Sequence, residues 1–263
     1  MVRATLIILL FPLFSFGTNY YFSATGNDAN NGLSTGLPKQ TLAAARGLSL
    51  VAGDSVLFKR GDTFRGYYVV SNSGSIGNPI IYGAYGTGAI PIISGAKNYG
   101  SAAQWQVYSG NIWKTVAPVG SVITSYIGHH DVANLIFNND AFTGKKEILV
   151  SSCNVQGDWT ILAGDTLYLF SLGNPGTFYT NIEVGGVYSE NVFKISGKNY
   201  ITVQNLDIRY SGNNEIFIET CTNIKVDNCK FQWTGGWWFD AAGKRMGNGV
   251  QMWQTNSNIE VSN

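Results

Sequence analysis

Apolar and polar residues alternate in short segments that recur along the C-terminal part of the chain. ITVQN (201–205), IKVDN (224–228) and IEVSN (259–263) each carry β-branched residues at the first and third positions and polar residues at the second and fourth. A period of two predicts a β-strand with one buried face, because a helix would place apolar residues every three or four positions. These segments are therefore predicted to be strands.

A second family of apolar segments precedes the first: FKI (193–195), IFI (216–218) and VQM (250–252). Ile201 and Ile224 are 23 residues apart, and so are Phe193 and Ile216. Two strand families that advance by the same step predict stacked coils, each coil repeating the one below. This is the sequence pattern of a parallel β-solenoid.

Asparagines end the three segments of the first family, at Asn205, Asn228 and Asn263. Stacked Asn side chains can hydrogen-bond one another and the turn backbone, and Asn tolerates the left-handed backbone conformation. Because they share one register, we expect a ladder of Asn side chains rather than three independent turn residues.

The N-terminal part shows a similar repeat. SVLF (55–58) and PIIY (79–82) are 24 residues apart, as are YVV (68–70) and IIS (92–94). This spacing predicts that the coils begin near Ser55.

Two segments of the chain depart from the repeat. Residues 38–51 place Leu42, Ala45 and Leu48 at helical spacing, which predicts a short helix that caps the first coil. Residues 97–190 fit the repeat poorly and are interpreted as an inserted antiparallel β region, with hairpin turns at Gly164-Asp165 and Asn174-Pro175.

The composition agrees with an all-β protein. The chain has 263 residues, of which 13% are charged and 13% aromatic, with 32 glycines and a net charge of +1. A near-neutral chain without a Lys/Arg run gives no electrostatic reason to expect a nucleic-acid partner. We expect a monomer.

The first residues resemble an export signal. Arg3 precedes an apolar stretch at 4–16 that is too short to span a bilayer, and small residues at 15 and 17 suit cleavage before Thr18. Residues 1–17 are therefore expected to be a signal peptide, and the mature chain to be secreted, with an extracellular, periplasmic or cell-surface location and no membrane partner.

Residues 18–263 are expected to form one domain, with regular coils at 191–263. The chain stops at Asn263, the last residue of a predicted strand, so we expect a C-terminally truncated fragment. The cysteines, Cys153, Cys221 and Cys229, are interpreted as small buried residues, with a Cys221–Cys229 disulfide as the alternative.

Three N-terminal segments carry a family resemblance: YYFSATGNDANNGLSTGLPKQTLAAA (20–45), AGDSVLFKRGDTFRG (52–66) and NPIIYGAYGTGAIPIISGA (78–96). They resemble the opening of secreted bacterial pectate-lyase-like proteins, and the coils at 193–263 are similar to the repeats of that superfamily. The resemblance implies a right-handed parallel β-helix and a polysaccharide ligand. It does not fix the activity, because the superfamily includes lyases, hydrolases, epimerases and non-catalytic surface proteins.

The repeat is interrupted once, and the interruption is rich in tryptophan. Ile216 and Val250 are 34 residues apart, 11 more than the usual step, and the surplus falls within 232–249. Insertions in solenoids form loops that often lie on the binding face. The candidate ligand-binding aromatics are Trp233, Trp237 and Trp238 in this loop, with Phe217 and Trp253 at outward strand positions. The alternative is a loop that folds back with its tryptophans packed together.

Charged residues near the loop suit an acidic sugar. Lys244, Arg245 and Asp240 are the candidate catalytic residues: a base must remove the proton next to a uronate carboxylate, and a cation must stabilise the charge that develops. Arg209 and Lys230 are candidates to bind other carboxylates of the substrate. Ca²⁺ is a candidate cofactor, with Asp240, Asp207, Asp227 and Glu219 as its possible ligands.

The histidines of the chain, His129 and His130, precede Asp131 within the inserted region. Histidine is the common acid–base residue near neutral pH, so a catalytic or metal-binding role is one interpretation. We favour a surface turn.

The sequence thus predicts a secreted, carbohydrate-active β-helix protein. A polysaccharide lyase that acts by β-elimination on uronic acids is the first hypothesis. A glycoside hydrolase or uronate epimerase on the same fold, a non-catalytic carbohydrate-binding or cell-surface solenoid, and a structural module of a larger chain are the alternatives.

Overall fold

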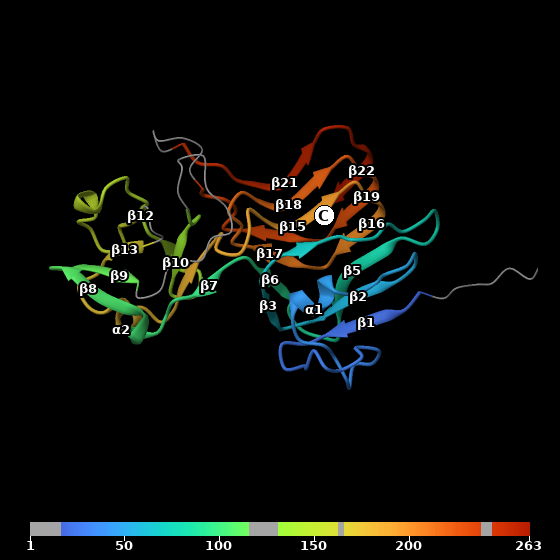
Figure 1. The fold of residues 1–263 in the computed structure, drawn as a ribbon, viewed down its shortest axis with the longest axis horizontal. Helices are drawn as coiled ribbons and strands as arrows, with labels where there is room; N and C mark the ends of the chain where they lie inside the picture. The colour runs from blue at the N-terminus through green and yellow to red at the C-terminus, as the bar shows by residue number, and fades with distance from the viewer. Residues whose placement is uncertain (1–16, 116–130, 163–165, 238–243) are drawn as a thin grey trace, which may run out of the picture.

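The computed structural model describes residues 17–115, 131–162, 166–237 and 244–263. These residues are nearly all in β-strands and turns, with very short helices. Figure 1 shows two parts side by side: stacked parallel sheets that contain the N- and C-terminal segments, and a smaller antiparallel part. The predicted signal peptide lies outside the described residues, apart from Gly17.

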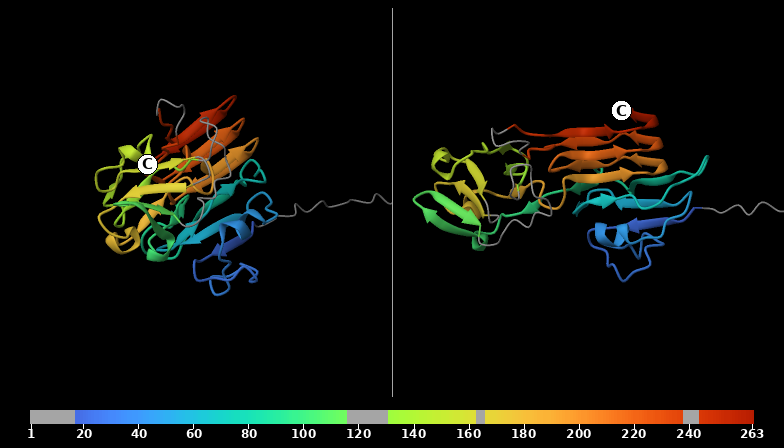
Figure 2. Two further views of the ribbon diagram at one scale, coloured as in Figure 1. Left: turned by 60° about the vertical axis from the view of Figure 1, so that its left-hand side comes forward. Right: turned by 45° about the horizontal axis from the view of Figure 1, so that its top comes forward.

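Three parallel sheets form the larger part. The first contains β1 (Asn19–Phe22), β2 (Ser55–Lys59), β5 (Ile80–Tyr85), β16 (Asn199–Gln204), β19 (Thr222–Asp227) and β22 (Ser257–Ser262). The second contains β3 (Thr63–Arg65), β6 (Ile92–Ser94), β17 (Asp207–Arg209) and β20 (Lys230–Gln232). The third contains β4 (Tyr68–Val69), β15 (Asn191–Ser196), β18 (Asn214–Glu219) and β21 (Asn248–Trp253). The chain visits the sheets in turn, so the strands stack as rungs (Figure 2).

The register of the C-terminal rungs follows the sequence repeat. Phe193 pairs with Ile216, and Ile201 with Ile224, each at the predicted step. Ile216 pairs with Val250, so the extra residues do leave the rung between β20 and β21. The apolar positions of these strands face inward and are buried, as the alternation predicts.

The N-terminal register was predicted incorrectly. Ser55 pairs with Ile81 rather than with residue 79, and the stack already includes β1, where Asn19 pairs with Ser55. Tyr68 pairs with Phe193, not with the strand at 92–94. The reason is that the inserted region separates consecutive rungs in sequence, so the partner of a strand cannot be found from spacing alone.

Aromatic side chains fill the middle of the stack. Phe193 is fully buried, and its ring centroid lies 5.0 Å from that of Tyr68 and 5.2 Å from that of Tyr82. The helix α1 (Leu42–Arg46) covers the stack near β4, with Leu42 buried in the same core. Helix α1 is shorter than the predicted 38–51, and the Thr41 hydroxyl caps it by accepting a hydrogen bond from the Ala44 N–H at 3.1 Å.

Asparagine ladders run along the stack. Asn228 donates to the side chain of Asn205 at 2.7 Å, and both have positive φ, which confirms that part of the predicted ladder. Asn263 instead donates to Asp227 at 2.9 Å. A second ladder, not predicted, runs through Asn191, Asn214 and Asn248 in the third sheet.

The antiparallel part contains two sheets. One is ordered β11 (Phe142–Thr143), β10 (Leu135–Phe137), β14 (Ile182–Val184) and β7 (Lys97–Asn98). The other is ordered β12 (Trp159–Leu162), β13 (Thr166–Phe170), β9 (Ile112–Thr115) and β8 (Trp105–Ser109). The 3₁₀ helices η1 (Ala102–Gln104) and η2 (Val150–Ser152) and the helix α2 (Pro175–Phe178) connect them. The turn expected at Asn174-Pro175 is the start of α2, because Pro suits the first turn of a helix and the Asn174 side chain caps it. The turn expected at Gly164-Asp165 falls outside the described residues.

The two parts are joined by ion pairs. Arg65 in β3 contacts Glu183 in β14, with 2.7 Å between the closest nitrogen and oxygen. Arg209 in β17 contacts Asp140 in the antiparallel part at 2.5 Å and also pairs with Asp207. The parts therefore pack against each other through paired charges.

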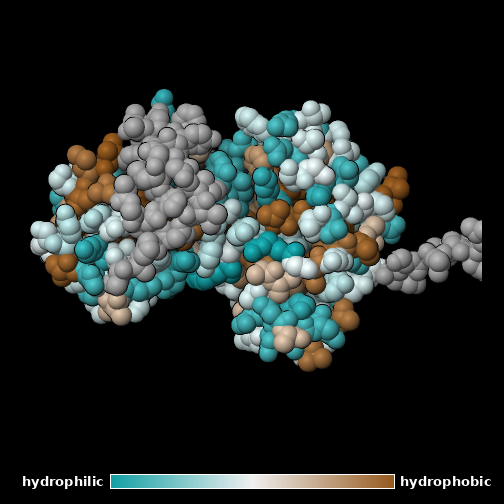
Figure 3. Space-filling model, viewed as in Figure 1, coloured by the Kyte–Doolittle hydropathy of each residue, from teal (hydrophilic) through white to brown (hydrophobic). Residues whose placement is uncertain are grey.

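The remaining expectations concern cysteines and the surface. Cys153, Cys221 and Cys229 are all free, so the alternative disulfide is not formed. On the face seen in Figure 3, hydrophobic residues form separate patches between hydrophilic ones. Among the described residues, no helix has the length and apolar character needed to cross a membrane.

Candidate functional site

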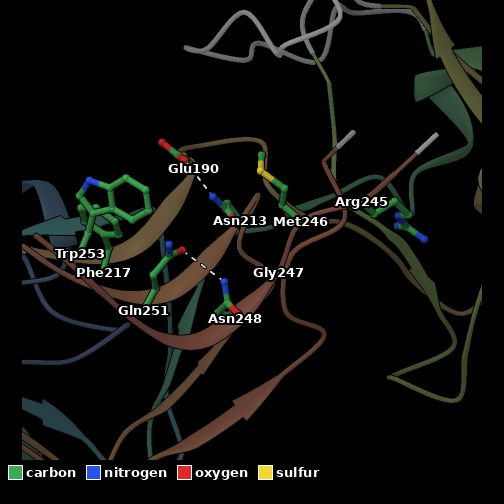
Figure 4. Close-up of a pocket in the computed structure, with 9 residues that line it drawn as sticks. All are labelled: Glu190, Asn213, Phe217, Arg245, Met246, Gly247, Asn248, Gln251 and Trp253. Atoms are coloured by element: carbon green, nitrogen blue, oxygen red, sulfur yellow. Dashed lines mark hydrogen bonds between the residues drawn. The ribbon is translucent and has the colours of Figure 1, made fainter. Parts of the chain in front are cut away.

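A groove of about 650 Å³ lies on the outer side of the third parallel sheet, where the sheet meets the turns that lead into it. Its lining residues come from two strands and three turns: Glu190, Asn213, Phe217, Arg245, Met246, Gly247, Asn248, Gln251 and Trp253. Figure 4 shows Phe217 and Trp253 together at one end and Arg245 at the other.

The aromatic end of the groove follows from strand alternation. Val250 and Met252 share the parity of the inward positions, so Gln251 and Trp253 point outward. Gln251 pairs with Phe217, which places an amide and an aromatic ring beside the indole of Trp253. Trp253 is 54% exposed although it is large and apolar, so the groove presents an open aromatic surface to solvent.

The polar side of the groove is ordered by hydrogen bonds. Asn213 donates its side-chain amide to the Glu190 carboxylate at 3.0 Å, and Asn248 donates to the Gln251 side chain at 3.2 Å. These bonds, drawn in Figure 4, hold donors and acceptors along one wall. The groove therefore offers three amides and one carboxylate next to two aromatic rings.

The tryptophan loop folds back onto the protein, contrary to the expectation that it presents its indoles to water. Trp237 is only 3% exposed and lies against the turn at Gly212, where a Cβ would meet its ring at 2.4 Å. The Trp237 N–H donates to the Gly212 carbonyl at 3.1 Å, and the Met246 N–H donates to the Trp237 carbonyl at 3.0 Å. Trp237 thus supports the groove from beneath. Trp238 lies outside the described residues.

Arg245 anchors the returning end of the loop. Its guanidinium donates to the carbonyls of Gly236 and Ala133, at 3.1 and 2.7 Å, and to the Asn134 side chain at 2.5 Å. Burial lowers the pKa of Arg245. Because these acceptors belong to the protein, Arg245 first positions the groove wall and is a poor candidate for a catalytic base.

A buried ion pair supports the same loop. Lys146 and Asp131 are in contact at 2.6 Å, with side chains 2% and 0% exposed, and Lys146 also donates to the Gly236 carbonyl at 3.2 Å. Burial lowers the pKa of Lys146, and the Asp131 carboxylate opposes this shift. The interpretation of Asp131 as part of a surface turn was therefore wrong, and its charge is offset by a lysine distant in sequence. His129 and His130 lie outside the described residues.

A second buried acid lies close in sequence to the groove. Glu215 follows groove residue Asn213 by two positions and is fully buried. Burial raises its pKa to about 8. One carboxyl oxygen accepts from the Ser211 N–H at 3.2 Å, while Oε2 has no hydrogen-bond partner among the described residues. Its neutral form is therefore favoured near neutral pH.

The other predicted binding residues divide into those at the groove and those elsewhere. Trp233 is half-buried against a small cluster of the antiparallel junction rather than in the groove. Arg209 is occupied by Asp207 and Asp140, so its guanidinium is not available to a substrate carboxylate. Lys230 is exposed on the second sheet, and Lys244 is exposed beside Arg245 without lining the groove. Asp240 lies outside the described residues.

The predicted calcium ligands are not brought together. Asp207 lies in β17 and pairs with Arg209, whereas Glu219 in β18 accepts a hydrogen bond from Ser196. Asp227 in β19 accepts bonds from Ser262 and Asn263. No cluster of three or more potential metal ligands occurs within 17–115, 131–162, 166–237 and 244–263. The described carboxylates thus do not fit one Ca²⁺ site.

Sequence reasoning missed Glu190, Asn213 and Gln251. Gln251 could have been found, because it occupies the outward position between Val250 and Met252. Glu190 and Asn213 lie in turns without periodicity, so only the folded chain shows that they meet.

Comparisons with known proteins point to carbohydrate-active enzymes. No family model matches the chain. It is 34% identical over 137 residues to a lacto-N-biosidase of Bifidobacterium longum subsp. longum, a match that covers 48% of this chain and 8% of that protein. The chain therefore spans a small fraction of its curated relative.

Solved structures show the fold. The structure of XylC in complex with xylose matches with a TM-score of 0.60 at 16% identity, over 81% of this chain and 41% of that chain. A GH136 lacto-N-biosidase from Eubacterium ramulus matches with a TM-score of 0.44 at 17% identity, over 93% and 33%. Pectate, rhamnogalacturonan and alginate lyases match at lower TM-scores. The expected resemblance thus holds for the broad class of β-helix-like, carbohydrate-active proteins.

Proposed function

We propose that this chain is the sugar-binding part of a secreted carbohydrate-active enzyme, built on a right-handed parallel β-helix, and that a polysaccharide or oligosaccharide binds in the groove at Trp253. The observation that carries the proposal is an exposed indole beside Phe217, with amides and a carboxylate along the adjoining wall. A flat indole complements the apolar face of a pyranose ring, and neighbouring amides suit its hydroxyl groups.

The comparisons support the ligand class. The curated relative is named a lacto-N-biosidase, and the structure with the higher TM-score was determined with xylose. Both names concern sugars. Because this chain covers a small part of each, they support a sugar ligand rather than a particular substrate.

Hydrolysis of a glycosidic bond is the reaction that we propose first. Glycosidases use a pair of carboxyl groups, and Glu190 is a carboxylate that lines the groove. Asn213 holds it by a hydrogen bond. The second carboxyl group would be supplied by Asp240 or by chain outside the described residues.

β-Elimination on a uronic acid is the second candidate, because one cation, Arg245, does line the groove. Its guanidinium is bonded to protein carbonyls, which weakens it as a base. Incubation with uronate polysaccharides and with neutral oligosaccharides distinguishes the reactions: elimination creates an ultraviolet-absorbing double bond, whereas hydrolysis creates only reducing ends.

Binding is tested with the Trp253→Ala and Phe217→Ala variants against a panel of oligosaccharides, followed by calorimetry. Both variants should bind at least tenfold more weakly, since stacking of a buried ring contributes about 1–2 kcal/mol. Tyr108→Ala is the matched control, because Tyr108 is 52% exposed and lies in the antiparallel part. Equal binding by Trp253→Ala and Tyr108→Ala would refute the proposal.

A further inference from the structure

We infer that Lys194 forms a subsite for an anionic group, a carboxylate or a sulfate, on the sugar that extends from the groove across β15. This inference rests on the proposed sugar-binding function and adds the charge of the preferred ligand. None of the sequence-based candidates for carboxylate binding included this residue.

The position of Lys194 follows from the register of the third sheet. Lys194 pairs with Phe217, and Phe217 pairs with Gln251, so three outward side chains form one row across three strands. Neighbouring strands lie about 5 Å apart, which is close to the length of a pyranose ring. A sugar chain that crosses the strands from the groove would therefore reach Lys194 within one residue of the sugar on Phe217.

Contact with the groove is direct. The Lys194 ammonium lies 5.6 Å from the centroid of the Phe217 ring. A cation near an aromatic face is held by the ring quadrupole, which limits the range of positions of the flexible side chain. The aromatic floor and the cation are therefore parts of one surface.

Lys194 also differs from the other cations in its pairing. Arg65, Lys146 and Arg209 are each bonded to a carboxylate of the protein. Within the described part of the chain, Lys194 has no carboxylate at ion-pair distance, and the nearby Glu219 accepts its hydrogen bond from Ser196. Its charge is thus available to a ligand.

The chemistry that suits this arrangement is an acidic glycan. Lys is a compact charge that attracts carboxylate and sulfate without requiring bidentate geometry. Glu190 lies at the polar side of the groove, so an anion would be repelled there and attracted at Lys194. The charges would fix the direction in which an acidic chain lies.

The test compares three oligosaccharides of equal length, one neutral, one carrying a carboxylate and one carrying a sulfate, by calorimetry at low and high salt. The wild-type chain should bind one or both anionic ligands more tightly than the neutral one, and salt should reduce the difference. Lys194→Gln should lose about threefold to tenfold in affinity for the anionic ligand and none for the neutral ligand, whereas Lys194→Arg should retain the preference.

Lys230→Gln is the matched control, because Lys230 is exposed on the second sheet away from the groove. It should bind all three ligands as the wild type does. A wild-type chain without preference for an anionic ligand, or a preference that survives in Lys194→Gln, overturns the inference. Loss of neutral binding in Trp253→Ala, with either result, leaves the proposed function standing, so the two failures are distinguishable.

Discussion

Arg65 and Glu183 face each other across the junction of the parallel and antiparallel parts, with two hydrogen bonds of 2.7 Å from the guanidinium to the carboxylate. Arg65 also donates to the Ala96 carbonyl at 3.0 Å, where the chain leaves the second sheet. The hydrogen bonds to Glu183 raise the pKa of Arg65. This pair fixes how the two parts meet.

We predict that Arg65→Ala lowers the free energy of unfolding by about 1–3 kcal/mol, because it leaves the buried Glu183 carboxylate without its partner while the exposed side of Arg65 contributes little. Arg65→Lys should lose less, since it keeps the charge but not the paired geometry. Urea denaturation measures both. The double variant Arg65→Ala, Glu183→Gln should recover part of the loss, and a double variant as unstable as Arg65→Ala would contradict this account.

The contact between Gly212 and Trp237 gives a second prediction. A Cβ on Gly212 would meet the indole at 2.4 Å, so Gly212→Ala should destabilise the fold by about 1–3 kcal/mol and displace the indole. Tryptophan fluorescence and thermal unfolding measure these effects.

Gly36→Ala provides the control for that variant, because the nearest atom to its added Cβ would be the Ser34 hydroxyl at 4.0 Å. Its stability should stay within about 0.5 kcal/mol of the wild type. Equal behaviour of the two variants would show that Trp237 does not pack as described.

Glu215 should make stability depend on pH. Its pKa is raised from the ordinary 4.5 to about 8, so between these values the folded chain holds a proton that the unfolded chain has lost. The stabilising contribution is therefore full at low pH and is lost as pH rises through this window.

The measurement is denaturant unfolding at several pH values, compared with Glu215→Gln. The variant should gain stability relative to the wild type as pH rises, because its amide never ionises. Glu260→Gln, at a 58% exposed side chain, is the control and should not show this trend. A constant difference between wild type and Glu215→Gln across the window would rule out the raised pKa.

The buried Asn ladder should contribute more to stability than the exposed one. Asn214 donates to Asn191 at 2.8 Å and accepts from Asn248 at 3.2 Å, so Asn214→Ala leaves two amides without partners and should cost about 1–3 kcal/mol. Asn228→Gly keeps the left-handed backbone at the exposed ladder and should cost under about 1 kcal/mol. Chemical denaturation ranks the two, and the reverse order would contradict the role of burial.

Much of the stacked part could be predicted from the sequence. The step from Phe193 to Ile216 and from Ile201 to Ile224 appears directly in the pairing, because in-register stacking forces equal spacing on each sheet. The outward positions of Phe217 and Trp253 follow from the same alternation. Where the repeat was interrupted, at the inserted region, the predicted pairing failed.

The candidate site was predicted only in part. The exposed indole of Trp253 was identified correctly, but the burial of Trp237 depends on the turn at Gly212, which no local pattern reveals. The roles given to Arg209 and Arg245 changed for a similar reason. Their partners, Asp140 and the carbonyls of Ala133 and Gly236, are distant in sequence and are brought close only by folding.

The place where the antiparallel part joins the stack has a consequence for how this protein can vary. Lys97 and Val184 are register partners, so the chain leaves the rungs and returns at neighbouring points, and the rungs on either side pair as if nothing lay between them. A graft of a different module at this point would leave the scaffold intact. It would also remove the acceptors that hold Arg245, so exchange of the module would retune ligand preference without altering a single strand beneath the groove.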